Sequence, residues 1–444
     1  MAEERSLGRF SIGVGDRFAH QARAQLTACK RAAEAGMQVV PVWNKSNREH
    51  KIIGSSPQET RAAADRAVRE LGWTAPYFCD ADHINLETVS GFLEPCDFFT
   101  IDVADRIGTA ANDAEVAAFT RRHGALLGRL ELPGLPEPLA IEQEDLDRVG
   151  RKYLAAALQA AEIYRAIEQT KGRGNFLTEV SMDETDTPQS PEELLLILAA
   201  LSDAEVPLTT IAPKFTGRFN KGVDYGGDPE VFARELEQDM AVVRYAVETF
   251  GLPAELKLSL HSGSDKFSIY GAVHHAMHNM DSGLHLKTAG TTWLEEVIGL
   301  AESGGDSLAL VKEIYAEAFA HRDELCAPYA AVIEIDAGKL PQPAEAERWS
   351  AEQWTQALRH DQSDPLYNPH LRQLMHVGFK VAAKMGRRYL DMLERHEDTV
   401  AANVTHNLFT RHIAPVFLGR EIAGRNSAAT AGAPEVSALS GTRR

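Results

Sequence analysis

Ionisable side chains lie at the ends of several short apolar segments of this chain. In one segment Lys257, Ser259 and His261 alternate with leucines, and in another His285 and Lys287 do the same. Because successive side chains of a β-strand point to opposite faces of the sheet, the polar residues of each segment share one face. Imidazole and carboxylate groups on such faces can bind a divalent metal ion, amines can bind an anion, and carboxylates can transfer protons.

Further segments end in the same way, so the strand-end groups form a larger set. Its members are Asp82, His83, Asp102, Glu179, Asp183, Lys214, His261, Asp265, Lys266, His285 and Lys287. A single histidine at a strand end is more often a capped or solvated residue than a ligand, but three at the same end of different strands favour a metal site. The mixture of imidazole and carboxylate does not select one metal.

Short apolar segments alternate with longer amphipathic ones along the chain, which is typical of βαβ units around a parallel sheet. The pattern predicts eight strands, at 39–44, 77–84, 98–103, 176–182, 208–215, 256–261, 283–287 and 330–335. It therefore indicates an α/β fold of the TIM-barrel-like (β/α)8 type with helical additions. Active sites of this architecture lie where the C-terminal ends of the strands meet, which is where the ionisable groups fall.

Two stretches depart from the regular alternation and predict additions to the barrel. We expect a TIM-barrel-like catalytic domain over residues 1–345 with a helical insertion near 106–170, followed by a helical extension over 346–425 that packs on the barrel. Residues 426–444 are rich in Ala, Ser, Gly and Thr with almost no large apolar residue. This composition predicts a disordered tail.

The composition excludes several classes of protein. The 444 residues carry 46 Lys plus Arg against 64 Asp plus Glu, a net charge of −18, which argues against nucleic acid as a partner. The chain has no apolar run long enough to span a membrane, and its first residues lack the apolar core of a signal peptide, so a cytoplasmic location is expected. Four scattered cysteines predict neither a disulfide framework nor a zinc knuckle.

Three local patterns leave alternatives open. The loop 213–222 carries Lys214, Arg218 and Lys221, and it either attracts an anionic substrate or is a surface loop with scattered charge. The turn 261–266 either receives an anion on its backbone amides and Lys266 or is a simple strand-to-helix turn. The pair His274 and His278 has the spacing of ligands on a helix, but without a nearby glutamate we interpret it as a solvated helix face.

Several long segments resemble the tagaturonate/fructuronate epimerase family, also described as hexuronate C4-epimerases. They include PVWNKSNREHKIIG at 41–54, YFCDADHINLETV at 77–89, LTEVSMDET at 177–185, TIAPKFTGRFNKGVDY at 210–225, LKLSLHSGSDKFSIYG at 256–271 and YNPHLRQLMHVGFKVAA at 367–383. The resemblance covers most of the chain apart from residues near 106–145 and the tail. It implies a divalent-metal-dependent enzyme of TIM-barrel type that interconverts two keto-hexuronates, tagaturonate and fructuronate.

That reaction inverts C4, whose hydrogen is not adjacent to the C2 ketone, and a retro-aldol cleavage of the C3–C4 bond followed by re-addition achieves it. We predict Asp82 and Glu179 as the groups that transfer protons. The predicted metal ligands are His83, His261 and His285, with Asp183 and His376 in reserve, for a Zn, Mn, Ni, Co or Fe ion. Because Asp82 and His83 have opposite strand parity, both can serve only if the chain turns out of the strand there.

The substrate carboxylate requires cations. The candidates are Lys45, Lys214, Arg218, Lys221, Lys266 and Lys287, of which the arginine is the most discriminating because it can bind a carboxylate through two hydrogen bonds.

Two rival functions share these features. A sugar-acid aldolase or ketol isomerase would use the same metal, carboxylates and basic loops, and a non-catalytic sugar-acid-binding protein would use them for recognition alone. The product formed from tagaturonate distinguishes the first rival, and binding without turnover would indicate the second. The sequence does not fix the oligomeric state.

Overall fold

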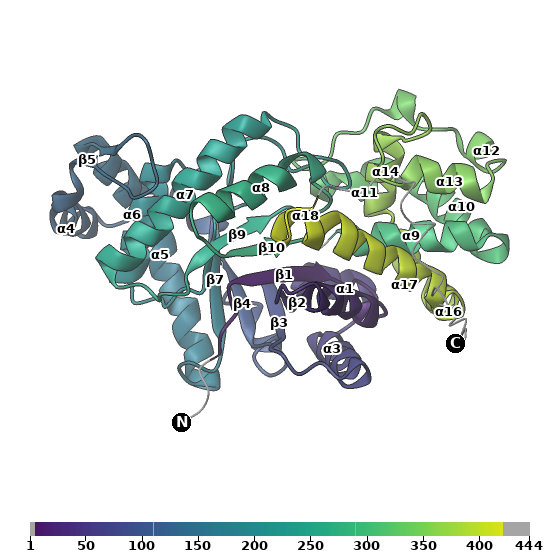
Figure 1. The fold of residues 1–444 in the computed structure, drawn as a ribbon, viewed down its shortest axis with the longest axis horizontal. Helices are drawn as coiled ribbons and strands as arrows, with labels where there is room; N and C mark the ends of the chain where they lie inside the picture. Colours follow the sequence, from purple (N-terminus) through teal and green to yellow (C-terminus); the bar gives the residue numbers. More distant parts are fainter. Residues whose placement is uncertain (1–4, 110, 289, 421–444) are drawn as a thin grey trace, which may run out of the picture.

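A computed structural model describes residues 5–109, 111–288 and 290–420 and contains a closed barrel of eight parallel strands (Figure 1). The strands follow one another around the barrel in the order β1-β10-β9-β8-β7-β4-β3-β2. Their bounds are β1 (Phe10–Gly15), β2 (Val40–Ser46), β3 (Phe78–Ile84), β4 (Phe98–Asp102), β7 (Leu177–Ser181), β8 (Thr210–Ala212), β9 (Lys257–His261) and β10 (Leu284–Lys287). The predicted TIM-barrel-like fold is therefore confirmed.

One predicted strand is wrong and another was missed. Residues 330–335 form turns and irregular backbone outside the barrel, where Val332, Ile333 and Ile335 are only partly buried. The eighth strand is instead β1, which pairs with both β2 and β10 and so closes the barrel. In its sequence, FSIGVG, Gly13 leaves room for the side chain of Lys287, because a Cβ at this position would lie 2.8 Å from Cγ of that lysine.

The two faces of the strands lie in different surroundings. Leucines such as Leu258, Leu260 and Leu286 belong to the main apolar core, which the strands share with the surrounding helices. The opposite faces point into the barrel. A separate apolar cluster of Leu7, Val40, Val42, Phe78, Phe98 and Leu177 fills the N-terminal end of the interior. The remaining interior positions towards the C-terminal end are polar, as the parity of the strand residues predicted.

Helices cover the outside of the barrel (Figure 1). They are α1 (Ala22–Glu34), α2 (Asn47–Ile53), α3 (Pro57–Leu71), α5 (Gln143–Lys171), α6 (Pro191–Asp203), α7 (Pro229–Phe250), α8 (Phe267–Asn279) and α9 (Thr291–Ser303). The insertion between β4 and α5 contains α4 (Asp113–Arg122) and an antiparallel pair, β5 (Gly128–Leu130) and β6 (Leu139–Ile141). The predicted helical insertion is thus part hairpin, and the long α5 packs against the neighbouring barrel helix α6.

The chain continues after α9 as a helical extension. It contains α10 (Gly305–Ala320), α11 (Arg322–Cys326), α12 (Pro343–Ala346), α13 (Ala351–Leu358), α14 (Pro369–Val377), α15 (Phe379–Met385), α16 (Arg387–Arg395), α17 (Glu397–His406) and α18 (Ala414–Phe417). A second apolar core joins this extension to the barrel, with Trp293 of α9 packed near Tyr389 of α16. The predicted tail at 426–444 lies outside the described residues. None of the described helices is long and apolar enough to cross a membrane.

A buried carboxylate ties the extension to the barrel. Asp265, in the loop after β9, accepts a hydrogen bond from Nη2 of Arg372 at 2.6 Å, and His360 and His412 approach it at 3.2 and 3.4 Å. All four side chains are almost fully buried. Burial opposes ionisation of Asp265, but Arg372 outweighs it and holds the pKa of this carboxyl well below its usual range. The ion pair therefore joins a barrel loop to α14.

Substitution Asp265→Asn is expected to destabilise the protein by about 3–5 kcal/mol, because it leaves the Arg372 guanidinium buried without its countercharge. Urea unfolding followed by circular dichroism measures the change. The control Arg387→Ala breaks an exposed ion pair with Asp391 and should cost less than about 1 kcal/mol. Equal stabilities of the two variants would contradict a role for Asp265 in holding the extension.

Candidate active site

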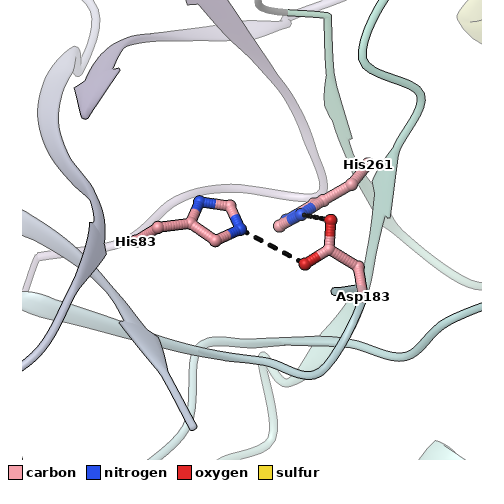
Figure 2. Close-up of side chains that lie close together, drawn as sticks. All are labelled: His83, Asp183 and His261. Carbon is pink, nitrogen blue, oxygen red and sulfur yellow. Dashed lines mark hydrogen bonds and ion pairs between the residues drawn. The ribbon is translucent and has the colours of Figure 1, made fainter. Parts of the chain in front are cut away.

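Three side chains converge at the C-terminal mouth of the barrel (Figure 2). Nε2 of His83 donates to Asp183 at 3.2 Å, and Nδ1 of His261 donates to the other oxygen of Asp183 at 2.9 Å. One possible ligand atom from each residue lies within 4.8 Å of the others. Among the residues that the structure describes, these are the ones whose geometry suits a metal ion. We refer to His83, Asp183 and His261 as the metal cluster.

The backbone of β3 turns sharply at His83 and brings it into the cluster. His83 has a φ of 52°, which side-chain-bearing residues rarely adopt, and the pairing of β3 with β4 shifts register between Ala81 and Ile84. This kink lets Asp82 and His83 both face the mouth despite their opposite parity. The chain was expected to turn out of the strand here, but β3 continues to Ile84, so the chain kinks within the strand instead of leaving it. Backbone strain at this point accompanies the site.

Each histidine of the cluster is held on its other side by a second carboxylate. Nδ1 of His83 donates to Asp82 at 2.9 Å, and Nε2 of His261 donates to Glu179 at 2.8 Å. Burial lowers the pKa of His261, but Asp183 and Glu179 outweigh burial and raise this pKa to about 9. Carboxylates that fix the second nitrogen of a ligating imidazole are typical of metal sites, because they orient the ring.

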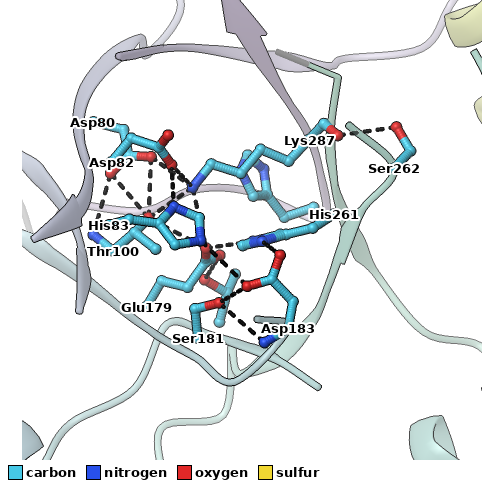
Figure 3. A network of polar contacts seen from close by, with 12 residues as sticks. Asp80, Asp82, His83, Thr100, Glu179, Ser181, Asp183, His261, Ser262 and Lys287 are labelled. Carbon is cyan, nitrogen blue, oxygen red and sulfur yellow. Dashed lines mark hydrogen bonds and ion pairs between the residues drawn. The ribbon is translucent and has the colours of Figure 1, made fainter. Parts of the chain in front are cut away.

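A lysine lies beneath the cluster with four oxygens around its amine (Figure 3). Nζ of Lys287 is 2.9 Å from Asp80, 2.7 Å from Asp82 and 3.3 Å from Glu179, and it donates to Oγ1 of Thr100 at 2.8 Å. Burial disfavours the charged amine, yet these carboxylates raise the pKa of Lys287 well above its usual value. Lys287 was predicted to bind the substrate carboxylate, but the structure surrounds its amine with carboxylates of the barrel.

The carboxylates of the site differ in their exposure. The side chains of Asp183 and Asp82 are 24% and 13% exposed, whereas that of Glu179 is fully buried. Both oxygens of Glu179 are also occupied, by His261 and Thr100 on one side and by Thr210 on the other. A molecule entering the mouth therefore meets Asp183 and Asp82, while Glu179 lies beneath His261.

His285 lies outside the metal cluster. It pairs in register with Ser259, one step deeper in the barrel than His261, and it shares a hydrogen bond with Oγ of Ser11 at 2.9 Å. Burial lowers the pKa of His285 to about 3. The structure thus does not bring this predicted ligand together with His83 and His261, and Asp183, the reserve candidate, takes its place. Parity gave the correct face of the strand but not the depth along it.

Three of the predicted substrate-binding lysines are engaged by the protein itself. Lys45 is buried and donates to the backbone oxygen of Arg17 at 2.5 Å and to Oγ of Ser55 at 2.7 Å. Lys214 donates to the backbone oxygen of Thr185. Lys266 is buried and donates to Oγ of Ser264 at 2.9 Å.

The other two predicted cations lie in the loop after β8. Arg218 pairs with Glu334 at 2.8 Å, and both side chains are 66% exposed, which places this pair on the surface. Lys221 is half-buried beside the ring of Tyr329, 5.8 Å from its centroid. Of the two, Lys221 lies in the more enclosed position.

Sequence reasoning missed three polar residues that the structure brings to the site. Asp80 and Thr100 contact Lys287, and Arg17 follows β1 at the mouth. Asp80 shares a strand face with Asp82, so the same parity rule would have identified it. Arg17 had no such signal, because its strand was not recognised.

The donor set of the metal cluster fits a divalent ion such as Zn, Mn, Fe, Co or Ni. Two imidazoles and one carboxylate are ligands that these ions accept, and the carboxylates behind both imidazoles complete the arrangement. The three possible ligand atoms already lie within 4.8 Å of one another. His376, the second reserve candidate, is not a member of this set, and the charged groups that act on its imidazole are cations.

Loss of a residue that only hydrogen-bonds to a metal ligand typically lowers metal affinity by roughly 10–100-fold. Substitution His261→Gln removes a predicted ligand itself, so we expect the affinity for added Mn²⁺ or Zn²⁺ to fall by more than that. The matched variant His285→Gln should keep the affinity, because His285 lies outside the cluster. Metal content after dialysis, measured by inductively coupled plasma mass spectrometry, decides between them. Loss of metal in His285→Gln with retention in His261→Gln would reverse the assignment.

The chain is similar to known proteins over most of its length. The family model for tagaturonate epimerase, UxaE, matches residues 3–415. A tagaturonate/fructuronate epimerase of Thermotoga maritima is 28% identical over 421 residues, which cover 91% of this chain and 80% of that protein. The native crystal structure of the fructuronate-tagaturonate epimerase of Cohnella laeviribosi superposes with a TM-score of 0.76 at 25% identity, over 93% of this chain and 82% of that one. The match spans both the barrel and most of the extension, so the chain belongs to the tagaturonate epimerase family, whose members are isomerases.

Proposed function

We propose that this chain interconverts D-tagaturonate and D-fructuronate by inverting C4, with the help of a divalent metal ion. The observation that carries the proposal is the metal cluster of His83, Asp183 and His261, with Asp82 at its edge, in the barrel mouth of a member of this family. The relatives from Thermotoga maritima and Cohnella laeviribosi bear names that describe this reaction.

The chemistry of the two sugars favours a retro-aldol route. The hydrogen on C4 is not acidified by the C2 ketone, because C3 lies between them. Removal of the proton from the C4 hydroxyl lets the C3–C4 bond break, so that C4 becomes an aldehyde and the electron pair passes to C3 and the C2 oxygen. Rotation of the aldehyde, re-addition of C3 and return of the proton to the C4 oxygen give the epimer.

His83, Asp183 and His261 are the residues that would hold the metal. A bound divalent ion supplies positive charge that stabilises negative charge on the oxygens of C2 and C3. Glu179 is buried beneath His261 and holds its ring, so we assign it to positioning rather than to contact with the sugar.

Asp82 is the group that we assign to the C4 hydroxyl proton. Its side chain reaches the mouth and is partly exposed, unlike Glu179 and Asp80. Burial opposes ionisation of Asp82, but Lys287 and His83 outweigh burial and keep its pKa below its usual range, so that the carboxylate is ionised at neutral pH. An ionised carboxylate at hydrogen-bonding distance can accept the proton and return it.

Asp82→Asn is expected to lower turnover of tagaturonate by about 100-fold or more, because it removes the proton acceptor. Since Asp82 also holds His83, the rate is measured at a Mn²⁺ concentration high enough to keep the metal cluster occupied. An NMR time course with tagaturonate and added Mn²⁺ measures the rate, and metal analysis checks that the ion is retained. The control Asp105→Asn changes an exposed aspartate on the turn after β4 and should leave the rate unchanged.

The same time course tests the proposal against its rivals. A C4 epimer as the product supports it. An aldose would indicate a ketol isomerase, two three-carbon fragments would indicate an aldolase, and binding without turnover would indicate a recognition protein. Full activity of Asp82→Asn would remove Asp82 from the mechanism without affecting the assignment of the reaction.

A further inference from the structure

Arg17 and His376 are among the buried side chains that have unused hydrogen-bonding groups. Nη1 of Arg17 has no hydrogen-bond partner among the described residues, and neither does either ring nitrogen of His376. Arg17 is 7% exposed and His376 is 1% exposed. Leaving such groups buried and unpaired costs about 1–3 kcal/mol each, so each calls for an explanation.

The two side chains come from distant parts of the chain and lie at one short stretch of it, where α14 is followed by α15. Arg17 follows β1, and its guanidinium stacks 4.4 Å above the ring of Phe379, at the start of α15. His376 lies near the end of α14, three residues earlier. Its ring packs so closely on Gly290, in the turn after β10, that a Cβ at Gly290 would clash with it.

The surroundings of His376 suit an anion rather than a metal ion. Burial lowers the pKa of this imidazole, and Arg17, Lys221, Arg372 and Lys266 lower it further because all four are positively charged. A metal cation at this position would be repelled by the same four positive charges. Arg372 is committed to Asp265 and Lys266 to Ser264. Arg17 donates from Nε to Glu49 at 3.1 Å, and its Nη1 has no hydrogen-bond partner among the described residues.

We propose that Arg17 and His376 bind the carboxylate of the keto-hexuronate and so make the enzyme specific for sugar acids. This inference rests on the proposed function and adds the residues that read the acidic end of the substrate. The free Nη1 of Arg17 and a ring N–H of His376 donate to the carboxylate oxygens, and Lys221 adds positive charge nearby. The helical extension thereby supplies part of the substrate site, through α14.

The placement is consistent with the chemistry at the metal cluster. The carboxylate of these sugars is C6, two carbons beyond the C4 that is inverted, so its binding site must lie beside the cluster and not within it. Arg17 follows β1, while the cluster lies on β3, β9 and the loop after β7, all at the same end of the barrel. Holding C6 at Arg17 leaves C2 and C3 free to face His83, Asp183 and His261.

The test compares two substrates on the full chain loaded with Mn²⁺. Arg17→Gln is expected to raise KM for tagaturonate by about tenfold or more, with a smaller change in kcat, because it removes a charged contact that is present before and during the reaction. KM for D-tagatose, which carries a neutral CH2OH in place of the carboxylate, should stay the same. If tagatose is turned over too slowly, its inhibition constant against tagaturonate is measured instead. His376→Asn carries the same expectation.

The controls separate loss of structure from loss of recognition. Arg388→Gln removes another arginine that binds a glutamate, Glu313, on the extension and should leave both KM values unchanged. Arg17→Lys keeps the positive charge and serves if Arg17→Gln does not fold. Equal rises for tagaturonate and tagatose, or an unchanged KM for tagaturonate in a folded variant, would overturn the proposal. A wild-type enzyme that does not epimerise tagaturonate would instead overturn the proposed function.

Discussion

The ammonium group of Lys287 is the interaction on which the interior of this barrel depends. Three carboxylates, from Asp80, Asp82 and Glu179, lie within 3.3 Å of its nitrogen in a largely buried space. Without that cation they would repel one another, and at least one would have to take up a proton. With it, Asp82 and Glu179 remain ionised and hold the two histidines that point at Asp183.

This arrangement requires the barrel interior to be layered. The apolar cluster at the N-terminal end excludes water from below, so the charges above it interact in a medium of low polarity. Each strand contributes its next inward residue to the next layer, which is why Asp80 is fully buried while Asp82, two residues later, is partly exposed at the mouth. The kink at His83 breaks this alternation at one point and brings in an imidazole that a regular strand would direct outward.

The helical extension has a structural link to the same end of the barrel. Arg372 of α14 is held by Asp265, and one turn later along that helix His376 reaches the turn after β10. A buried ion pair of this kind is costly to assemble and strongly destabilising to break, so it fixes position more than it adds stability. Anchoring α14 at Arg372 orients His376 and Phe379, on which Arg17 stacks.

The sequence by itself determined the fold class, the family and the inward faces of β7, β9 and β10, because alternation and long motifs are local properties of the chain. It also identified Asp82, His83, Glu179, Asp183 and His261 as members of one site. The depth of a residue in the barrel depends on strand register, which pairs residues far apart in the chain. The sequence therefore did not show that His285 lies outside the cluster or that carboxylates enclose Lys287. The identity of the eighth strand and the stacking of Arg17 on the helical extension were likewise decided only by the tertiary structure. Closing the barrel pairs Phe10 with Leu284, and docking the extension brings Phe379 onto Arg17, which lies more than 350 positions earlier in the chain.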